Sequence, residues 1–264
     1  EHGAQLWRGV TVEELLLYWG GDERGSDFAG PREDFPVCVP VGTQFPHAVG
    51  VALAFRLRGE DRAAVVVGGD GATSRGDFHE AMNMAGVWRA PLVFIVNNNQ
   101  WAISVPRARQ SAAGTLAQKA VAAGLPGEQV DGCDAIAVEE AVARALARAR
   151  AGEGATLIEC VTYRLSDHTT ADDATRYRDD AEVSRHWAEE PIRRLRAHLV
   201  EAHGWTRDEE EALREAVRAE IEAGAAAYLD RAPEPATAVV DHLHARLPAG
   251  LAGLRARLAG EADG

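Results

Sequence analysis

Two polar groups in one stretch of the chain have the residue types and the spacing of a metal site. They are Asp70, which stands between two glycines, and Asn99, the last of three consecutive asparagines. The apolar run AAVVVG precedes the first group and APLVFIV precedes the second, so each follows a predicted strand, with a predicted helix between them. Because the carboxyl ends of parallel strands meet at one edge of a sheet, the two groups should lie close together. Carboxylate and amide oxygens are ligands that Mg²⁺ or Ca²⁺ prefers, so a divalent cation is expected here.

The glycines beside the aspartate indicate an anion next to that cation. Gly69 and Gly71 allow a tight turn, and the backbone N–H groups of Gly71, Ala72 and Thr73 come just before the predicted helix, where a phosphate binds favourably. An aspartate among such amides would repel the phosphate unless a cation lay between them. The residues therefore predict a metal that holds a diphosphate, although GDG on its own is also a common turn sequence.

The elements that must position these groups alternate between strands and helices. The segment TVEELLLYW starts with a capping box and predicts a short helix, and residues 20–42, rich in Gly, Pro and charge, predict a long loop. The sequence then predicts helices over 44–58, 76–88 and 136–151, and strands over 63–68, 91–97, 128–131 and 155–162. This order predicts an α/β fold with a mostly parallel sheet and helices on both of its faces.

Two further patterns concern the second half of the chain. The helix over 136–151 has one apolar stripe, which we expect to face the sheet and which consists of Ile136, Val138, Val142, Ala145, Leu146 and Ala149. After Tyr163 the sequence is polar and aperiodic, and from Ser184 it is mostly Ala, Glu, Arg and Leu, which predicts a helical tail. We therefore expect an α/β domain over 1–183 that binds the diphosphate, with a helical C-terminal extension over 184–264.

Composition excludes several classes of function. The 264 residues are 46% hydrophobic, enough for a sizeable core, and the net charge of −13 opposes binding to nucleic acid or to an acidic membrane. Three cysteines without CxxC spacing indicate neither a disulfide framework nor a zinc site and favour a reducing cytoplasm. No apolar run is long enough to cross a membrane, and the first residues lack the apolar centre of a signal peptide. The sequence starts without Met, so we expect an N-terminally shortened chain.

Four blocks of sequence together resemble a known enzyme family. The segment from Gly68 to Ser104 resembles the thiamine-diphosphate motif, in which GDG is followed at a distance by NN. With it, VGTQFPHAVGVALAFRLRG, TLAQKAVAAGLPGEQVDGCD and YRLSDHTTADDATRYR occur in the order found in the α subunit of the decarboxylating first component of 2-oxo acid dehydrogenase complexes. The resemblance covers essentially the whole chain. It implies a thiamine-diphosphate-binding fold, oxidative decarboxylation of a 2-oxo acid, and reductive acylation of a lipoyl group.

The resemblance also implies roles for individual residues around the cofactor. Asp70, Asn99 and the main-chain carbonyl of Trp101 would ligate Mg²⁺. The turn that would lie against the diphosphate consists of Gly69, Asp70, Gly71, Ala72 and Thr73.

Outside that motif, the resemblance implies further contacts with cofactor and substrate. Val41 would wedge between the two rings of the cofactor, and Thr43 and Gln44 match positions that hold a structural K⁺ in some relatives. Arg164 would reach the phosphates. His168 would face the reacting carbon as the catalytic residue and would also contact the cofactor; a histidine there can shuttle protons near neutral pH.

Three departures from the family pattern bear on activity. Relatives carry a Tyr-Arg pair upstream of EHG that contacts the diphosphate, and this sequence begins after it. Asp167 stands where relatives often have Pro or His, and Arg75 stands where they have an acidic residue or Gln. An anionic Asp167 beside His168 would disfavour an anionic substrate.

The resemblance implies partners as well. The glutamate that activates the cofactor belongs to the β subunit in this family, so an α2β2 heterotetramer is expected, together with a lipoyl-bearing acyltransferase. TLAQKAVAAGLPG favours pyruvate as the substrate, whereas VGTQFPHAVG also fits branched-chain relatives; an acetoin dehydrogenase α subunit is a further alternative. An NAD dehydrogenase is disfavoured because GxGxxG spacing is absent after the strand, and a subunit that keeps the fold without turnover is the non-enzymatic alternative.

Overall fold

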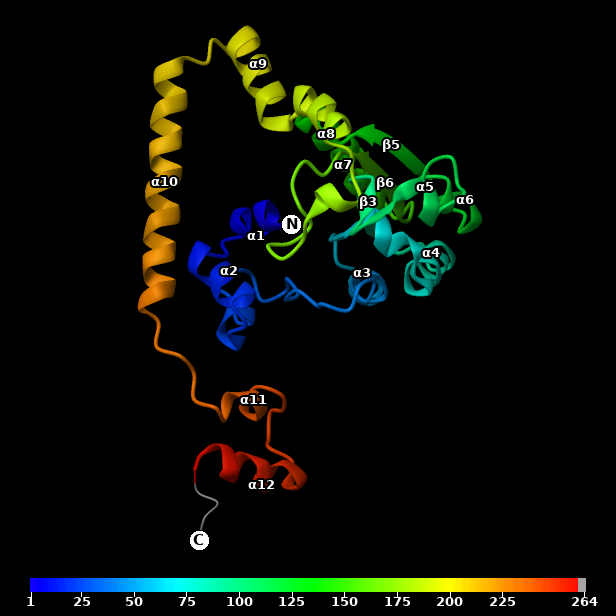
Figure 1. Ribbon diagram of the computed structural model, residues 1–264. Coiled ribbons are helices and arrows are strands. Elements are labelled where there is room, and N and C mark those ends of the chain that lie inside the picture. Colours follow the sequence, from blue (N-terminus) through cyan, green and yellow to red (C-terminus); the bar gives the residue numbers. More distant parts are fainter. Residues whose placement is uncertain (261–264) are drawn as a thin grey trace. The chain divides into compact units, whose positions relative to one another are not determined.

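The computed structural model describes residues 1–260, which divide into two compact units. The sheet unit comprises Cys38–Trp205 (Figure 1). The terminal unit joins Glu1–Val37 to the chain from Thr206 onward. The predicted domain boundary after residue 183 stays a prediction.

Four parallel strands form the sheet of the sheet unit. Their order is β1 (Ala64–Gly69), β2 (Leu92–Asn98), β6 (Thr156–Val161) and β5 (Gly127–Asp131). In the pair formed by β1 and β2, Gly69 lies opposite Asn97, so these two strands end side by side. The α/β fold with a parallel sheet is confirmed. A separate antiparallel pair, β3 (Trp101–Ala102) and β4 (Val105–Pro106), follows β2.

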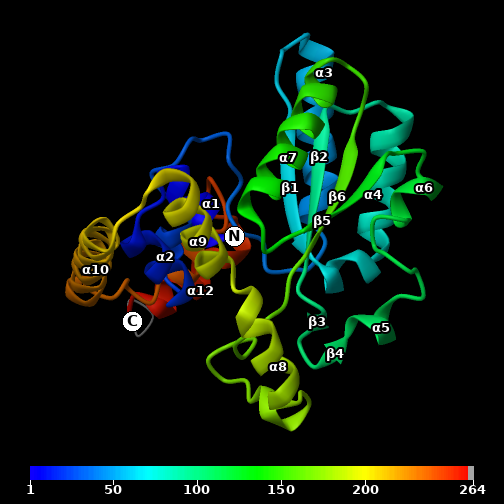
Figure 2. The ribbon, with the colours of Figure 1, turned by 90° about the horizontal axis from the view of Figure 1, so that it is seen from above.

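Helices cover both faces of the sheet, as the alternating sequence pattern predicts. α3 (Gln44–Arg58), α4 (Gly76–Val87) and α6 (Lys119–Ala122) share a core with one face, and α7 (Ala135–Arg150) packs on the other (Figure 2). In the first core the rings of Phe45 and Phe78 meet edge to face, 4.9 Å between centroids. A Cβ at Gly68 would lie 2.5 Å from the Phe45 ring, so this position on β1 needs glycine for α3 to approach.

The predicted apolar stripe of α7 is partly wrong. Ile136 is 40% exposed, whereas Ala141, which lies outside the predicted stripe, is buried. The buried residues of α7 are alanines four residues apart, Ala141, Ala145 and Ala149, because small side chains allow a helix to pack closely on a sheet. The larger apolar residues Val138, Val142 and Leu146 are only partly buried, beside that line of alanines.

The remaining elements of the sheet unit lie in its connections. η2 (Asp70–Ser74) joins β1 to α4, and α5 (Arg107–Gln110) follows β4. After β6 come η3 (Ala174–Arg176), α8 (Asp180–His186), η4 (Trp187–Glu189) and α9 (Pro191–His203). The predicted polar loop over 164–180 therefore contains only one short 3₁₀ turn before α8.

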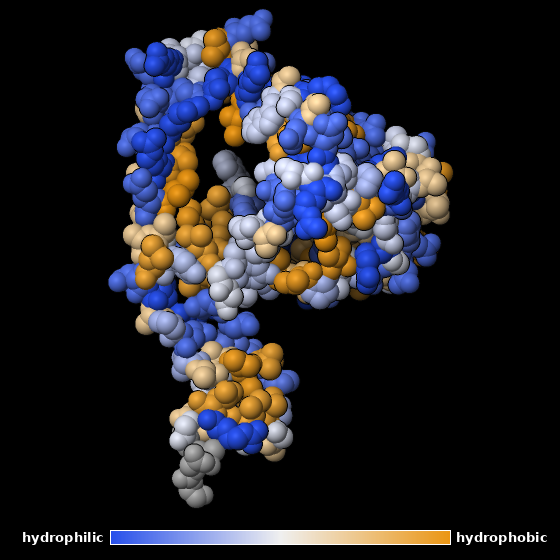
Figure 3. Space-filling model, in the orientation of Figure 1, coloured by the Kyte–Doolittle hydropathy of each residue, from blue (hydrophilic) through white to orange (hydrophobic). Residues whose placement is uncertain are grey.

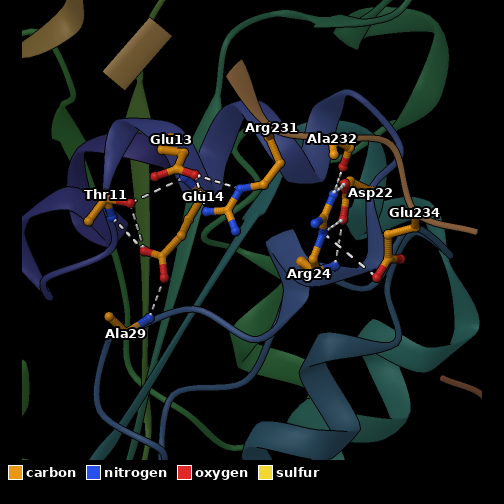
Figure 4. A network of polar contacts seen from close by, with 9 residues as sticks. All are labelled: Thr11, Glu13, Glu14, Asp22, Arg24, Ala29, Arg231, Ala232 and Glu234. Carbon is orange, nitrogen blue, oxygen red and sulfur yellow. Dashed lines mark hydrogen bonds and ion pairs between the residues drawn. The ribbon is translucent and has the colours of Figure 1, made fainter. Parts of the chain in front are cut away.

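The terminal unit is helical. It contains α1 (His2–Trp7), α2 (Val12–Trp19), η1 (Glu23–Ser26), α10 (Arg207–Asp230), α11 (Ala238–Asp241) and α12 (Ala249–Leu258). The predicted capping box of α2 is present between Thr11 and Glu14. Figure 4 shows how ionic contacts join α2 and η1 to the chain after α10, through the pairs Glu13–Arg231 and Arg24–Glu234 and through the hydrogen bond from Arg24 to the carbonyl of Ala232.

Apolar side chains gather along one side of α10 (Figure 3). Leu213, Val217 and Ile221 stand four residues apart and each is exposed. No helix among residues 1–260 combines the length and the apolar character needed to span a membrane.

Candidate functional site

Asp70 is a buried carboxylate at the end of β1. Asp70 is only 3% exposed, and Gln110 Nε2 donates a hydrogen bond to Asp70 Oδ2 at 3.0 Å. Burial raises the pKa of Asp70, while the hydrogen bond from Gln110 and the charge of Arg164 act in the opposite direction. Because the net effect disfavours the ionised form, a cation placed beside this carboxylate would be strongly stabilising.

Asn99 lies at the neighbouring strand end, directly after β2. Its Oδ1 accepts a hydrogen bond from the backbone N–H of Trp101 at 3.1 Å, which folds the chain back after the strand. An amide oxygen has two lone pairs, so one remains for a metal. Gln100 and Ile103 both have positive φ, 72° and 55°, so this hairpin holds two non-glycine residues in the left-handed region.

The turn after β1 and the hairpin after β2 are in contact. A Cβ at Gly71 would lie 2.8 Å from the Cβ of Ala102, so glycine is required for this close approach. At Gly69, by contrast, a Cβ would meet no atom within 4 Å. The structure thus brings the predicted Mg²⁺ ligands to one edge of the sheet and leaves open space beside the turn predicted to bind diphosphate.

Hydrogen bonds from Lys119 hold the turn after β1 in place. Thr73 is fully buried, and its Oγ1 donates to the carbonyl of Asp70 at 2.8 Å. Lys119 Nζ donates to the carbonyl and to Oγ1 of Thr73, at 2.7 and 2.9 Å. Burial lowers the pKa of Lys119, and the nearby charge of Arg107 lowers it further. The Nζ group of Lys119 therefore lies against the turn predicted to bind diphosphate.

Arg164 organises the loop after β6. Its guanidinium donates to the carbonyl of Ile103 at 3.0 Å and to the hydroxyl of Tyr177 at 2.7 Å. Its Nη1 is buried without a hydrogen-bond partner in the described chain. Arg178, itself buried, donates to the carbonyls of Arg164, Leu165 and Ser166 and closes the loop on itself.

His168 lies at the exposed end of this loop. Its backbone N–H donates to Asp172 Oδ2 at 2.9 Å, and within residues 1–260 its imidazole has no hydrogen-bond partner. Asp167, which departs from the family pattern, accepts a hydrogen bond from the backbone N–H of Ala174 at 2.9 Å. The carboxylate of Asp167 is thus engaged in shaping the loop.

The segment before α3 contains the remaining predicted residues. Val41 is 57% exposed, as a residue that contacts a ligand rather than the core would be. Thr43 Oγ1 donates to the carbonyl of Pro40 at 2.8 Å. Gln44 accepts from the N–H of Gly42 at 3.1 Å and donates to the carbonyl of Val67 at 3.2 Å, so it joins this segment to β1.

Comparison with known proteins decides the family. Residues 1–237 match the family described as dehydrogenase E1 component. The chain belongs to this family. The α subunit of 3-methyl-2-oxobutanoate dehydrogenase of Mycobacterium tuberculosis is 49% identical to this E1 chain over 211 residues, 80% of the chain and 58% of the relative. The α subunit of the pyruvate dehydrogenase E1 component of Staphylococcus aureus is 40% identical over 248 residues, 94% of the chain and 67% of the relative.

The predicted resemblance to α subunits of this component is therefore confirmed. The chain matches somewhat less than two thirds of the length of its M. tuberculosis relative.

An open cavity of about 770 Å³ shares Trp101 with the candidate site of this E1 chain. It is lined by residues that follow β2, β5 and β6, among them Trp101, Cys133 and Tyr163. The rings of Tyr163 and His186 stack on its wall, 3.9 Å between centroids. Such a cavity at the carboxyl ends of parallel strands lies where this class of fold commonly binds ligands.

Sequence reasoning missed three residues of the site: Gln110, Lys119 and Glu159. The first two contact the turn after β1 from segments distant in sequence, and no local pattern marks them. Glu159 did have a signal, since it is the charged residue in the otherwise apolar strand TLIECV. No group of three or more His, Cys, Asp or Glu side chains within residues 1–260 could hold a metal, and the predicted Mg²⁺ site is of another kind, with one carboxylate.

Proposed function

We propose that this E1 chain is the α subunit of a 2-oxo acid dehydrogenase that depends on thiamine diphosphate. Its reaction is oxidative decarboxylation of a 2-oxo acid and transfer of the acyl group to a lipoyl group. The observation that carries the proposal is the buried carboxylate of Asp70 beside the Asn99 hairpin, at neighbouring strand ends of a chain in the dehydrogenase E1 family. The relatives named as pyruvate and 3-methyl-2-oxobutanoate dehydrogenase α subunits support the same reaction class.

The residues present fit a metal and a diphosphate. Asp70, Asn99 and the carbonyl of Trp101 would hold Mg²⁺, which prefers oxygen ligands of these kinds. The open space beside Gly69 and the unpartnered Nη1 of Arg164 suit the phosphates. Thiamine diphosphate supplies, when bound, the nucleophilic carbon and the electron sink for decarboxylation.

The chain's own residues would bind, orient and exchange protons. The exposed Val41 would pack against the rings of the cofactor and keep them bent. His168, whose imidazole is free of hydrogen-bond partners in the described chain, would donate or accept a proton at the oxygen of the substrate. Arg164 would leave part of its present loop contacts to reach a phosphate.

The remaining assignments concern partners, potassium and compartment. A β subunit would supply the glutamate that activates the cofactor and complete an α2β2 heterotetramer, and a lipoyl-bearing acyltransferase would accept the acyl group. Thr43 and Gln44 would hold a structural K⁺. The odd number of cysteines, all three of them free, does not suggest a disulfide framework and favours the cytoplasm.

Two substrates are supported by different observations. The block TLAQKAVAAGLPG favours pyruvate, whereas the higher identity, 49% against 40%, favours a branched-chain 2-oxo acid. A measurement of kcat/KM for pyruvate and for 3-methyl-2-oxobutanoate on one preparation separates them. The substrate with the higher value is the one that the site selects.

The test of the proposed function is a cofactor titration of the chain produced together with the β subunit of the same organism. We expect Mg²⁺-dependent binding of thiamine diphosphate and decarboxylation with an artificial electron acceptor. Binding without turnover would support a non-catalytic subunit instead. No binding by the heterotetramer would refute the proposal.

A further inference from the structure

Glu159 is a charged side chain in the centre of the sheet. It belongs to β6, which lies between β2 and β5, and it is fully buried. Burial of an ionised carboxylate is strongly unfavourable unless hydrogen bonds or an opposite charge compensate it. The proposed reaction gives this residue no role, yet both of its oxygens have defined partners.

One oxygen of Glu159 fixes the end of β2. Asn98 Nδ2 donates to Oε1 at 2.7 Å, and Asn98 Oδ1 in turn accepts from the N–H of Gln100 at 3.2 Å. Asn98 directly precedes Asn99, so these two bonds define how the chain leaves the strand. The orientation of the predicted amide ligand therefore depends on Glu159.

The other oxygen fixes the segment that carries Lys119. The backbone N–H of Ala117 donates to Oε2 at 2.9 Å, and Glu159 also attracts the charge of Lys119. Lys119 Nζ binds Thr73, whose hydroxyl donates to the carbonyl of Asp70. A continuous chain of contacts thus leads from Glu159 to the turn of the predicted carboxylate ligand.

We infer that Glu159 is a positioning residue that fixes the Asn99 hairpin relative to the Asp70 turn, and so sets the geometry of the metal and diphosphate site. The inference rests on the proposed function. Its physical basis is that Glu159 receives two donors, one on each oxygen, from the two segments that must be held in register. An amide side chain has one acceptor oxygen, which can occupy only one of these two oxygen positions.

Glu159→Gln is the direct test, because it keeps the shape and removes one acceptor. Its NH₂ group would face the N–H of Ala117 or the NH₂ of Asn98, and a flip of the Asn98 amide would lose the bond from Gln100. We expect affinity for Mg²⁺ with inorganic diphosphate, a probe that lacks the cofactor rings, to fall at least tenfold in the heterotetramer, a scale typical of lost outer partners of metal ligands.

Ile158→Val is the matched control. Ile158 is fully buried in the same strand, its side chain points to the opposite face of the sheet, and it packs in the core under α7. The substitution removes one methyl group from the core and so also destabilises the fold. We expect its affinity for Mg²⁺ and diphosphate to stay within about twofold of the wild type, because it does not touch the contacts to Asn98 and Ala117.

Lys119→Met provides a second route if Glu159→Gln does not fold. It removes the bonds to Thr73 without altering the strand, and we expect weaker binding of the same probe. In the double variant the two losses should be less than additive, because both lie on one chain of contacts.

The outcomes separate the inference from the proposed function. If the wild-type heterotetramer does not bind thiamine diphosphate, the proposed function fails. If it binds, and Glu159→Gln or Lys119→Met binds the probe as well as Ile158→Val does, the positioning role of Glu159 is overturned.

Discussion

Without ligand, the Asp70→Asn variant should be more stable than the wild type. With ligand bound, the variant should be less stable than the wild type. Burial raises the pKa of Asp70 even though Gln110 and Arg164 favour its charge, so the ionised carboxylate is held at a cost to folding. Asparagine has the same shape and no charge. Under the proposed function, Asp70 is a residue at which stability is exchanged for binding, which is common at functional sites.

The size of the effect follows from the burial of this residue, which is 3% exposed. Relief of the buried charge should contribute about 1 kcal/mol, which for a unit of this size raises Tm by about 2–4 °C. With Mg²⁺ and thiamine diphosphate at about 100 times Kd, the wild type should gain about 2.7 kcal/mol, or roughly 5–10 °C, and the variant almost none. The order of the two melting temperatures should therefore reverse.

The pH dependence has the same origin. Because the folded-state pKa of Asp70 lies above its ordinary value, the native state holds more protons than the unfolded state between those two values. The stability that the protonated form confers is fully present below the ordinary aspartate pKa. It is lost as the pH rises through the raised pKa of Asp70 in the folded state. Asp70→Asn should lack this component of the pH profile.

Differential scanning calorimetry of both proteins, with and without Mg²⁺ and cofactor, measures all of these quantities. Asp70→Glu is the matched control, since it keeps the charge and moves it by one methylene. Equal ligand-induced shifts in wild type and Asp70→Asn would refute the metal assignment. A lower Tm of the ligand-free variant would refute the argument from burial.

Three further predictions concern the loop after β6 and the cysteines. His168→Ala should lower turnover of the complete complex by about 10²-fold with little change in cofactor affinity, because the residues at the strand ends are unchanged. Steady-state kinetics and a cofactor titration measure the two quantities. Near wild-type turnover would contradict the catalytic role. Hydrogen exchange over 164–180 should slow when cofactor binds, since Arg164 can pair with phosphate, and equal exchange in both states would count against a cofactor-ordered loop. Cys160 should resist thiol reagents at pH 8 until the chain unfolds, because burial raises its pKa to about 11, whereas the exposed Cys38 should react. Mass spectrometry of the labelled chain distinguishes the two cysteines. Rapid labelling of Cys160 would show that β6 opens locally.

The fold was readable from the sequence where one local signal sufficed. α3 begins and ends at the predicted residues, Gln44 and Arg58, because glycine follows it in the left-handed region and terminates it. The four strands of the parallel sheet are predicted within one residue at each end, and apolar runs mark β1, β2 and β6. The two-residue strands β3 and β4 are not predicted. The stripe of α7 was misjudged because hydrophobicity ranks Ile136 above Ala141, whereas close packing on a sheet selects small residues.

The candidate site was predictable only in part, for a similar reason. Asp70 and Asn99 follow strands, and adjacent parallel strands bring their ends together, so spacing and topology were enough. Gln110 and Lys119 contact the turn after β1 across 40 and 46 residues of chain, and such contacts leave no local pattern. Glu159 is marked by its charge within its strand, but the sequence does not reveal its partner Asn98, 61 residues away. The loop with Arg164 and His168 closes through Arg178, whose role depends on three carbonyls that a sequence does not reveal.

The positive φ of Ile103 has a consequence for the order in which this molecule matures. A β-branched residue in the left-handed region costs about 1–3 kcal/mol, so the hairpin after Asn99 does not adopt its shape by local preference. It is imposed by neighbours that exist only once the sheet is assembled, such as Arg164, which donates to the carbonyl of Ile103. A newly made chain would thus acquire its sheet before this hairpin, and on warming it would lose the hairpin before it loses the sheet.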